Sequence, residues 1–244
     1  GYTYLSDFPT TTDAYDTSHN GKYDVFVSKL NGDLTSLLAS TYLGGSDSDH
    51  ANSITIDASG NVCVAGYTYS SDFPTTTEAY DISYNDSEDV FLSKLSGDLT
   101  NLLASTYLGG SNYDNAKSIA IDSNGNVYVT GYANSSGFPT TIDAYDTSYN
   151  GNYDVFVTKL SGDLTNLLAS TFLGGYEYDY GYSISTDLIG NVYVSGYTSS
   201  PNFPISPVAL HAYYGDNTDA YISKLNNNLT NLLSSSYIKS GANN

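Results

Sequence analysis

The sequence predicts an all-β protein, a β-propeller of four repeats of about 65 residues with four antiparallel strands per blade. The same residue pattern begins again at a fixed interval along the chain, at Gly1, Gly66, Gly131 and Gly196. Within each copy, short β-branched and aromatic runs alternate with turns rich in Gly and Asn, which disfavours helix. Units of this kind bury their apolar faces only against like neighbours. We therefore expect one domain, residues 1–244, divided into repeats 1–65, 66–130, 131–195 and 196–244.

One copy shows the expected elements in order. Residues 118–122 (SIAID) alternate isoleucine with small or polar neighbours, which is the period of a strand. Gly125 follows in a tight turn, where positive φ favours glycine. Residues 127–132 predict a second strand, and after a long irregular stretch residues 154–160 and 167–173 predict the third and fourth. A β-solenoid is the alternative, but its coils are shorter and lack this hairpin pattern.

The run DVFVSKLxGDLTxLLASTYLGGS…SIAIDSNGNVYVTGYTxSxxFPTT resembles the SBBP repeat, which is named for a seven-bladed β-propeller family. The resemblance covers essentially the whole chain. It implies that the SIAID strand is innermost and the LLASTYL strand outermost, in a secreted or surface protein of bacteria or archaea. It implies no particular activity.

On that strand order, the first blade is incomplete at its N-terminal side. The chain begins inside a second strand, so the first blade lacks its innermost strand, and residues 240–244 do not resemble one. We expect further repeats, an additional N-terminal segment or another chain to close the ring. A four-bladed ring is the alternative if Gly1 is only where the ordered chain begins.

The charge balance excludes several classes of partner. The chain has 26 acidic residues against 7 lysines and no arginine, a net charge of −19. Nucleic acid and anionic lipid both require basic residues, so neither is an expected partner. No apolar run approaches the ~18 residues of a membrane span. We expect an acidic extracellular or cell-surface protein, in which the lone Cys63 is a packing residue.

The loop entering the third strand has the spacing of a calcium-binding loop. Oxygen-bearing side chains stand at positions 1, 3, 5 and 9 with glycine at 6, as in residues 16–24 and 146–154. Such loops resemble those of calcium-binding propellers, for example in integrin α subunits. Asp-x-Ser and Asn-Gly are also ordinary turn formers, which is the competing interpretation. The predicted Ca²⁺ ligands are Asp16, Ser18, Asn20, Asp24, Asp81, Ser83, Asn85, Asp89, Asp146, Ser148, Asn150 and Asp154.

Other polar residues recur at equivalent positions and have a structural interpretation. One aspartate ends the first strand and is expected to cap the hairpin turn (Asp57, Asp122, Asp187). Another precedes that strand and is expected to be a solvated loop acid, or else to line the rim and face a cation (Asp49, Asp114, Asp179). A lysine of the third strand is expected to lie along the blade and reach a neighbouring carboxylate rather than form a ring of charge (Lys29, Lys94, Lys159, Lys224).

Aromatic residues punctuate the long loop of each repeat. Phe-Pro pairs, followed by a tyrosine in three copies, are expected to fasten this loop between blades (Phe8, Phe73, Phe138, Phe203; Tyr15, Tyr80, Tyr145). A sugar site between blades is the alternative, because aromatic faces stack on pyranose rings. Tyr67, Tyr132 and Tyr197 are candidates for it, although core packing is the favoured role.

Catalysis has little support in the sequence. His19, His50 and His211 occupy non-equivalent repeat positions, and no nucleophile–base constellation can be assembled. We expect a non-enzymatic extracellular scaffold or adhesion module, calcium-stabilised, that takes a protein or glycan ligand at its loops or between blades. A multivalent carbohydrate-binding lectin is the alternative, and a fragment of a propeller-type polysaccharide-active enzyme is a further one.

Overall fold

The computed structural model describes residues 1–215 and 217–238, and all regular elements in them are strands. None of these residues belongs to a helix long and apolar enough to cross a membrane. The strands are β1 (Tyr2–Thr3), β2 (Asp24–Leu30), β3 (Leu37–Leu43), β4 (Asp49–Ile56), β5 (Val62–Thr68), β6 (Asp89–Leu95), β7 (Leu102–Leu108), β8 (Asp114–Ile121), β9 (Val127–Ala133), β10 (Asp154–Leu160), β11 (Leu167–Leu173), β12 (Asp179–Thr186), β13 (Val192–Thr198), β14 (Asp219–Leu225) and β15 (Leu232–Ile238).

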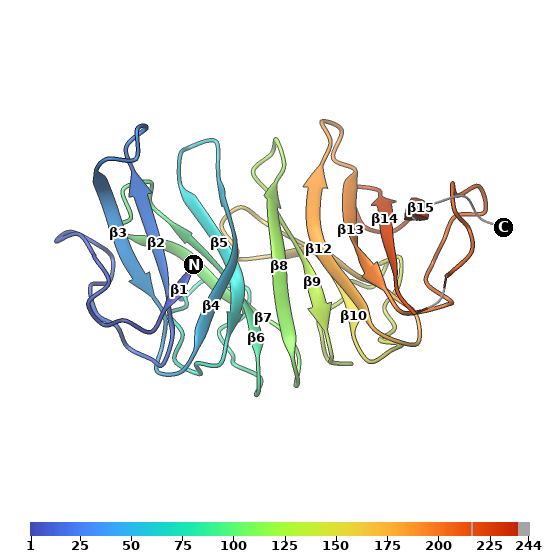
Figure 1. The fold of residues 1–244 in the computed structure, drawn as a ribbon, viewed down its shortest axis with the longest axis horizontal. Coiled ribbons are helices and arrows are strands. Elements are labelled where there is room, and N and C mark those ends of the chain that lie inside the picture. Colours follow the sequence, from blue (N-terminus) through green and yellow to red (C-terminus); the bar gives the residue numbers. More distant parts are fainter. Residues whose placement is uncertain (216, 239–244) are drawn as a thin grey trace.

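The strands form four antiparallel meanders, one for each repeat. Their orders are β1-β2-β3, β4-β5-β6-β7, β8-β9-β10-β11 and β12-β13-β14-β15, which we call the first to fourth blades. Figure 1 shows the blades side by side in chain order, with the first and last at opposite ends of the row. Strands β4, β8 and β12 contact one another in series and are the innermost strands. The predicted propeller blades and strand order are confirmed, and the described sheets do not close into a ring.

The first blade is incomplete at its N-terminal side, as predicted. Its strand β1 pairs with β2 only through Tyr2 with Val25 and Thr3 with Asp24. In the second blade, the equivalent strands β5 and β6 pair over seven residues each. Phe26 exchanges main-chain hydrogen bonds with Gly1, at 2.9 and 3.4 Å. Residues 27–30 of β2 have no partner strand on their inner side among the described residues, and we call them the open edge. Residues 240–244, for which no strand is expected, lie outside the described residues.

The hydrophobic core lies between blades rather than within one sheet. One cluster joins the first and second blades through residues such as Val27 and Phe91, and equivalent clusters fill the next two junctions. Cys63 is buried in the cluster between the second and third blades, as expected of a packing residue. Because the second and third sheets are covered on their two faces by neighbouring blades, a single blade would expose most of its apolar surface.

The long loop of each blade fastens it to the next, which confirms the role expected of the Phe-Pro segment. Phe73 is 3% exposed and lies in the core between the first two blades, against Phe91 at 4.4 Å between ring centroids. The amide of Tyr80 donates to the carbonyl of Leu164 in the following blade, at 2.9 Å. Leu164 itself has a positive φ of 59° and is almost fully buried. The loop and the next hairpin thus form one unit across the junction.

The hairpin between the two inner strands is built as expected. Asp122 accepts hydrogen bonds from the amides of Asn124 and Asn126, both at 2.9 Å, and Gly125 has a φ of +84°. The equivalent Asp57 and Asp187 make the same contacts. The aspartate is therefore a turn cap in each complete blade.

Candidate functional site

The predicted calcium loops are held by hydrogen bonds of their own. In the first loop, Asp16 accepts from the amide of Ser18 at 2.8 Å, and Asp24 accepts from the amide of Asn20 at 2.6 Å. The side-chain amide of Asn20 donates to Asp16 at 2.9 Å. The structure therefore brings Asp16, Asn20 and Asp24 together, while Ser18 takes part through its backbone. These are also the contacts of an ordinary Asx turn.

The other two loops repeat this arrangement with one difference. Asp146, Ser148, Asn150 and Asp154 make the same four-residue set of contacts, with Asn150 donating to Asp146 at 3.3 Å. In the second loop Asp81 and Asp89 accept from Ser83 and Asn85, but the Asn85 side chain turns to the carbonyl of Ser83. No group of three or more His, Cys, Asp or Glu residues arranged for a metal occurs in residues 1–215 and 217–238. Calcium in these loops stays a prediction.

The aspartates expected to be solvated loop acids are buried, and that expectation is wrong. Asp49, Asp114 and Asp179 are 0% exposed and are the first residues of the innermost strands. The reason is local: each carboxylate accepts the amide of the second glycine in the preceding Gly-Gly turn, as Asp114 does from Gly110 at 2.6 Å. Because this Gly-Gly turn lies between two blades, the aspartate that caps it is buried as well.

Each of these aspartates approaches the aspartate that begins the third strand of the preceding blade. The pairs are Asp24 with Asp49, Asp89 with Asp114, and Asp154 with Asp179, and we call them the junction pairs. Gly109 lies between the members of the second pair. A Cβ on it would stand 2.5 Å from Oδ1 of Asp89 and 3.1 Å from Oδ2 of Asp114. Only glycine leaves room for both carboxylates here.

Burial governs the electrostatics of the junction pairs. Burial raises the pKa of Asp89 to about 7. It also raises the pKa of Asp114 to about 7, and the negative charge of Asp89 acts in the same direction. Burial raises the pKa of Asp49 only to about 6, since the hydroxyls of Thr68 and Ser70 and the amide of Gly45 donate to its carboxylate. Burial therefore raises the pKa of every carboxylate in the junction pairs.

A second candidate site is a row of aromatic rings, the aromatic belt, on the two inner strands of the blades and on the residues that directly precede β2, β10 and β12. It consists of Tyr2, Tyr23, His50, Tyr67, Tyr132, Tyr153, Tyr178, Tyr180, Tyr182 and Tyr197. His50 stacks on Tyr67 with ring centroids 4.7 Å apart and an interplanar angle of 8°. The ammonium of Lys117 lies 5.8 Å from the ring centroid of Tyr67 and 5.2 Å from that of Tyr132. It therefore connects the part of the belt around Tyr67 with the part around Tyr132.

The tyrosines of the belt do not have the core-packing role that the sequence predicts for them. Tyr67, Tyr132 and Tyr197 are half-buried and contact other belt residues instead of lying in the core clusters. The stacking role of His50 was not foreseen, because its repeat position holds Asn115 and Tyr180 in the next two blades. The shared signal is that this position always carries a planar side chain.

A β-bulge in every innermost strand aims one side chain out of the regular pattern. The strand pairing shifts between Ala51 and Ser53, between Ala116 and Ser118, and between Gly181 and Ser183. The extra residue is Asn52, Lys117 or Tyr182, so equivalent positions carry an amide, an ammonium and a phenol. Bulges of this kind re-aim side chains at functional sites. The bulge also explains why the strand begins at Asp114, four residues before the alternating pattern is visible.

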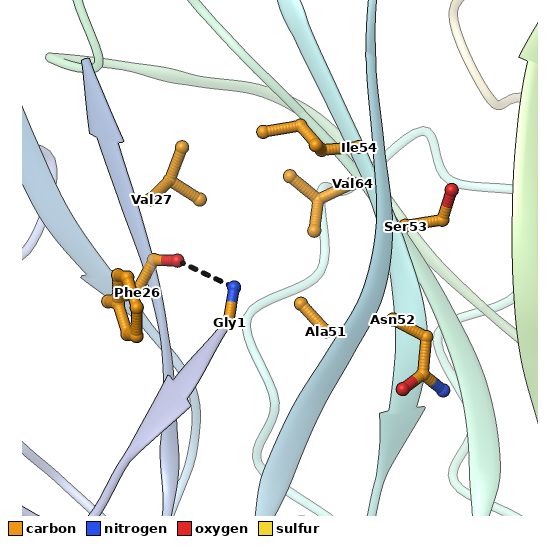
Figure 2. A pocket seen from close by; sticks show the side chains of 8 residues that line it. All are labelled: Gly1, Phe26, Val27, Ala51, Asn52, Ser53, Ile54 and Val64. Carbon is orange, nitrogen blue, oxygen red and sulfur yellow. Dashed lines mark hydrogen bonds between the residues drawn. The ribbon is translucent and has the colours of Figure 1, made fainter. Parts of the chain in front are cut away.

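The third candidate site is the groove beside the open edge. Figure 2 shows the pocket between β2 and β4, where Val27, Ile54 and Val64 converge and the amino group of Gly1 contacts the carbonyl of Phe26 at 3.4 Å. Its volume is about 250 Å³. Ile54 is 59% exposed, whereas its equivalents Ile119 and Ile184 are covered by the preceding innermost strand and are only 7% and 6% exposed. The groove is therefore a blade junction that lacks one side.

Three of the recurring lysines reach a neighbouring aspartate, as expected, and the contacts of Lys29, Lys94 and Lys159 with the next blade are an addition to that expectation. Lys94 forms an ion pair with Asp57 at 2.7 Å and also donates to the carbonyl of Gly162 in the next blade at 3.1 Å. Lys159 and Lys224 lie 3.9 and 3.8 Å from the equivalent aspartates. Lys29 donates to the carbonyl of Gly97 at 2.8 Å. These contacts assign the lysines to blade packing.

Comparison with known proteins agrees with this architecture. The family model for the SBBP beta-propeller repeat matches residues 40–74, 105–139 and 170–204. Each match runs from the outermost strand of one blade to the Phe-Pro segment of the next, and so spans a junction with its buried aspartate. A search of curated proteins found no match to the chain. The chain therefore contains three segments that match the SBBP β-propeller repeat, one across each blade junction.

Proposed function

We propose that this protein is a non-enzymatic β-propeller scaffold of the cell exterior or cell surface whose open edge takes a β-hairpin, supplied by a preceding repeat or by another chain. The observation that carries the proposal is the unpaired inner side of residues 27–30 beside the apolar groove. An unpaired strand edge offers main-chain hydrogen bonds to an added strand, and a neighbouring apolar pocket offers a place for its side chains. Main-chain hydrogen bonds supply affinity, and side-chain pockets supply specificity.

The complete junctions indicate what fits the groove. In them, a serine hydroxyl of the preceding innermost strand accepts a hydrogen bond from an isoleucine amide. Ser53 accepts from Ile119 and Ser118 accepts from Ile184, both at 3.2 Å. It also supplies Asn52, whose side-chain amide donates to the carbonyl of Ala116 at 2.8 Å. A partner that repeats this chemistry is a β-hairpin with the sequence of the two inner strands of an SBBP repeat.

A synthetic hairpin tests the proposal. The peptide carries residues 46–65 with Cys63→Tyr, which reproduces Tyr128, and stops where Gly1 and β1 already fill the sheet. We expect saturable binding by fluorescence polarisation. The same peptide with Ser53→Ala loses the acceptor for the Ile54 amide and should bind about 2- to 10-fold more weakly. No binding at peptide concentrations on the order of 1 mM would contradict strand addition.

The proposed location is supported by the charge of the chain. A net charge of −19 favours a well-solvated surface and opposes contact with nucleic acid or anionic lipid. Labelling of intact cells of the source organism with a membrane-impermeant amine reagent tests the location. The protein should be labelled along with known surface proteins, and recovery with cytoplasmic markers alone would contradict it.

A lectin function is a second candidate, favoured by the aromatic belt. Tyr178 and Tyr182 are 42% and 47% exposed, and the ring of Tyr178 is nearly parallel to that of Tyr180 at 6.4 Å. Exposed tyrosine faces beside polar side chains suit the stacking of sugar rings. A glycan array compares the wild type with Tyr182→Ala and with Tyr213→Ala, an 83% exposed tyrosine outside the belt. Binding that Tyr182→Ala alone removes would support the lectin; the absence of any glycan binding would oppose it.

A further inference from the structure

The second junction pair contains carboxylate oxygens that no protein group satisfies. Asp89 accepts the amide of Asn85 at 2.7 Å, and Asp114 accepts the amide of Gly110 at 2.6 Å. Each uses Oδ2 for this contact, whereas Oδ1 of both residues is buried without a hydrogen-bond partner. Both residues are 0% exposed. Buried oxygens of this kind are rare in folded proteins and call for a ligand or a proton.

The two carboxylates of the second junction pair converge on Gly109. A Cβ on this glycine would stand 2.5 Å from Oδ1 of Asp89 and 3.1 Å from Oδ2 of Asp114. The third junction is not equivalent, because it keeps Gly151 and Thr198, whose hydrogen bonds act to lower the pKa of Asp154 and Asp179 against the effect of burial. Carboxylate oxygens are ligands of hard cations.

The first junction pair shows how the same architecture is satisfied without a ligand. There, Asp24 accepts the amides of Asn20 and Gly21 through its two oxygens, and Asp49 accepts from Gly45 and from the hydroxyl of Thr68. In the third blade Ala133 replaces that threonine, and in the second loop Asp86 replaces that glycine. The second junction pair has thus lost a donor at each aspartate while keeping both carboxylates.

Two buried carboxylates without a countercharge are costly. No lysine forms an ion pair with a member of the second or third junction pair within residues 1–215 and 217–238. Removing two like charges from water without compensation costs several kcal/mol, so either a proton or a cation must neutralise them. A divalent cation neutralises both carboxylates, whereas one shared proton leaves a net negative charge in the junction.

We propose that Asp89 and Asp114 bind Ca²⁺ at the junction of the second and third blades. Ca²⁺ suits the place because it accepts flexible shells of carboxylate and carbonyl oxygens, whereas Mg²⁺ demands a near-ideal octahedron. The site differs from the predicted loop site: Asp81, Ser83 and Asn85 are not its ligands, and the second carboxylate comes from the next blade. The ion would fasten two blades together.

Calcium binding and thermal unfolding of the full chain test this proposal. Calorimetric titration should show binding, and the unfolding midpoint should rise by about 2–4 °C between EDTA and millimolar Ca²⁺. Asp114→Asn should remove the binding and the rise. Asp81→Asn, in the loop, and Asp143→Asn, at an exposed position, should change neither. Ala133→Thr restores the hydroxyl found at Thr68 and Thr198, so it should fold, gain stability in EDTA and lose part of the calcium response.

Three results would overturn the proposal. The first is an unchanged midpoint up to about 10 mM Ca²⁺, with Asp114→Asn more stable than the wild type in EDTA and in calcium, since the pair would then share a proton. The second is loss of binding in Asp81→Asn, which would move the ion to the loop. The third is binding that neither Asp114→Asn nor Ala133→Thr changes. Binding of the hairpin peptide at the open edge does not involve these residues, so the two proposals fail separately.

Discussion

The amide of Tyr15 in the first blade donates a hydrogen bond of 2.8 Å to the carbonyl of Leu99 in the second. Leu99 has a φ of +61°, an uncommon conformation for a residue with a side chain, and is 0% exposed. The same contact recurs between Tyr80 and Leu164 at 2.9 Å and between Tyr145 and Leu229 at 2.8 Å. The neighbouring blade therefore holds this strained turn in place, and the turn inserts the Leu99 side chain into the core between the two blades.

Truncation of this leucine should reveal how much one blade supports the next. Leu164→Ala removes a side chain that is 2% exposed between the second and third blades, and should lower the free energy of unfolding by about 2–5 kcal/mol. Leu34→Ala is the matched control: Leu34 occupies the same turn with a φ of +60° but is 74% exposed, so it should change stability by no more than about 0.5 kcal/mol. Urea unfolding measures both. Equal losses would contradict the inter-blade role.

A methyl group at a junction pair should be costly. Gly109→Ala places a Cβ 2.5 Å from Oδ1 of Asp89, and we expect a loss of about 1–3 kcal/mol because two buried carboxylates must shift. Gly32→Ala adds a Cβ that meets nothing within 4 Å and should be nearly neutral. Thermal unfolding of the two variants in EDTA gives the comparison. A neutral Gly109→Ala would mean that the carboxylates do not converge on this glycine.

The ion pair between Asp57 and Lys94 predicts a dependence of stability on acid. Burial by itself would raise the pKa of Asp57, but hydrogen bonds from Lys94 and Asn61 outweigh it and hold the pKa well below its usual range. Because the folded state keeps the carboxylate charged, the contribution is complete above the ordinary aspartate pKa and is lost as the pH falls below it. Asp57→Asn should therefore lower the unfolding midpoint at pH 7.

The difference between this variant and the wild type should shrink as the pH falls below about 4. Asp187→Asn is the control, because the Lys224–Asp187 pair is longer, at 3.8 Å, and more exposed, so its effect at pH 7 should be smaller. A difference that stays constant from pH 7 to pH 2.5 would contradict the role of the charge. Differential scanning fluorimetry across this pH range measures all three proteins.

The repeats made most of the fold predictable. Residues 154–160 and 167–173 form β10 and β11 with the expected bounds, because their apolar pattern and turn residues agree with the tertiary structure. The bounds of the innermost strands were harder to predict. Strand β8 begins at Asp114, whereas the pattern indicates a start at residue 118, since the bulge at Lys117 breaks the alternation.

The candidate sites depended on information that one repeat does not contain. The pattern around Asp114 resembles any turn, and its burial follows only from the blade that packs over it. The left-handed turn at Leu164 had one signal, a leucine retained in the hairpin of every copy (Leu34, Leu99, Leu164, Leu229), but leucine does not ordinarily mark positive φ. The aromatic belt joins positions from different blades, so its members could be named but not grouped.

Hydrogen exchange of the open edge tests the central claim most directly. Amide exchange of residues 27–30 is measured by NMR in the free protein and with a saturating amount of the 46–65 hairpin, with β10 as the internal reference. The account predicts slower exchange at the amides of residues 27–30 that point away from β3, and unchanged protection in β10, whose two edges are already paired. Exchange in residues 27–30 that the peptide leaves unchanged, or protection that appears elsewhere instead, would contradict it.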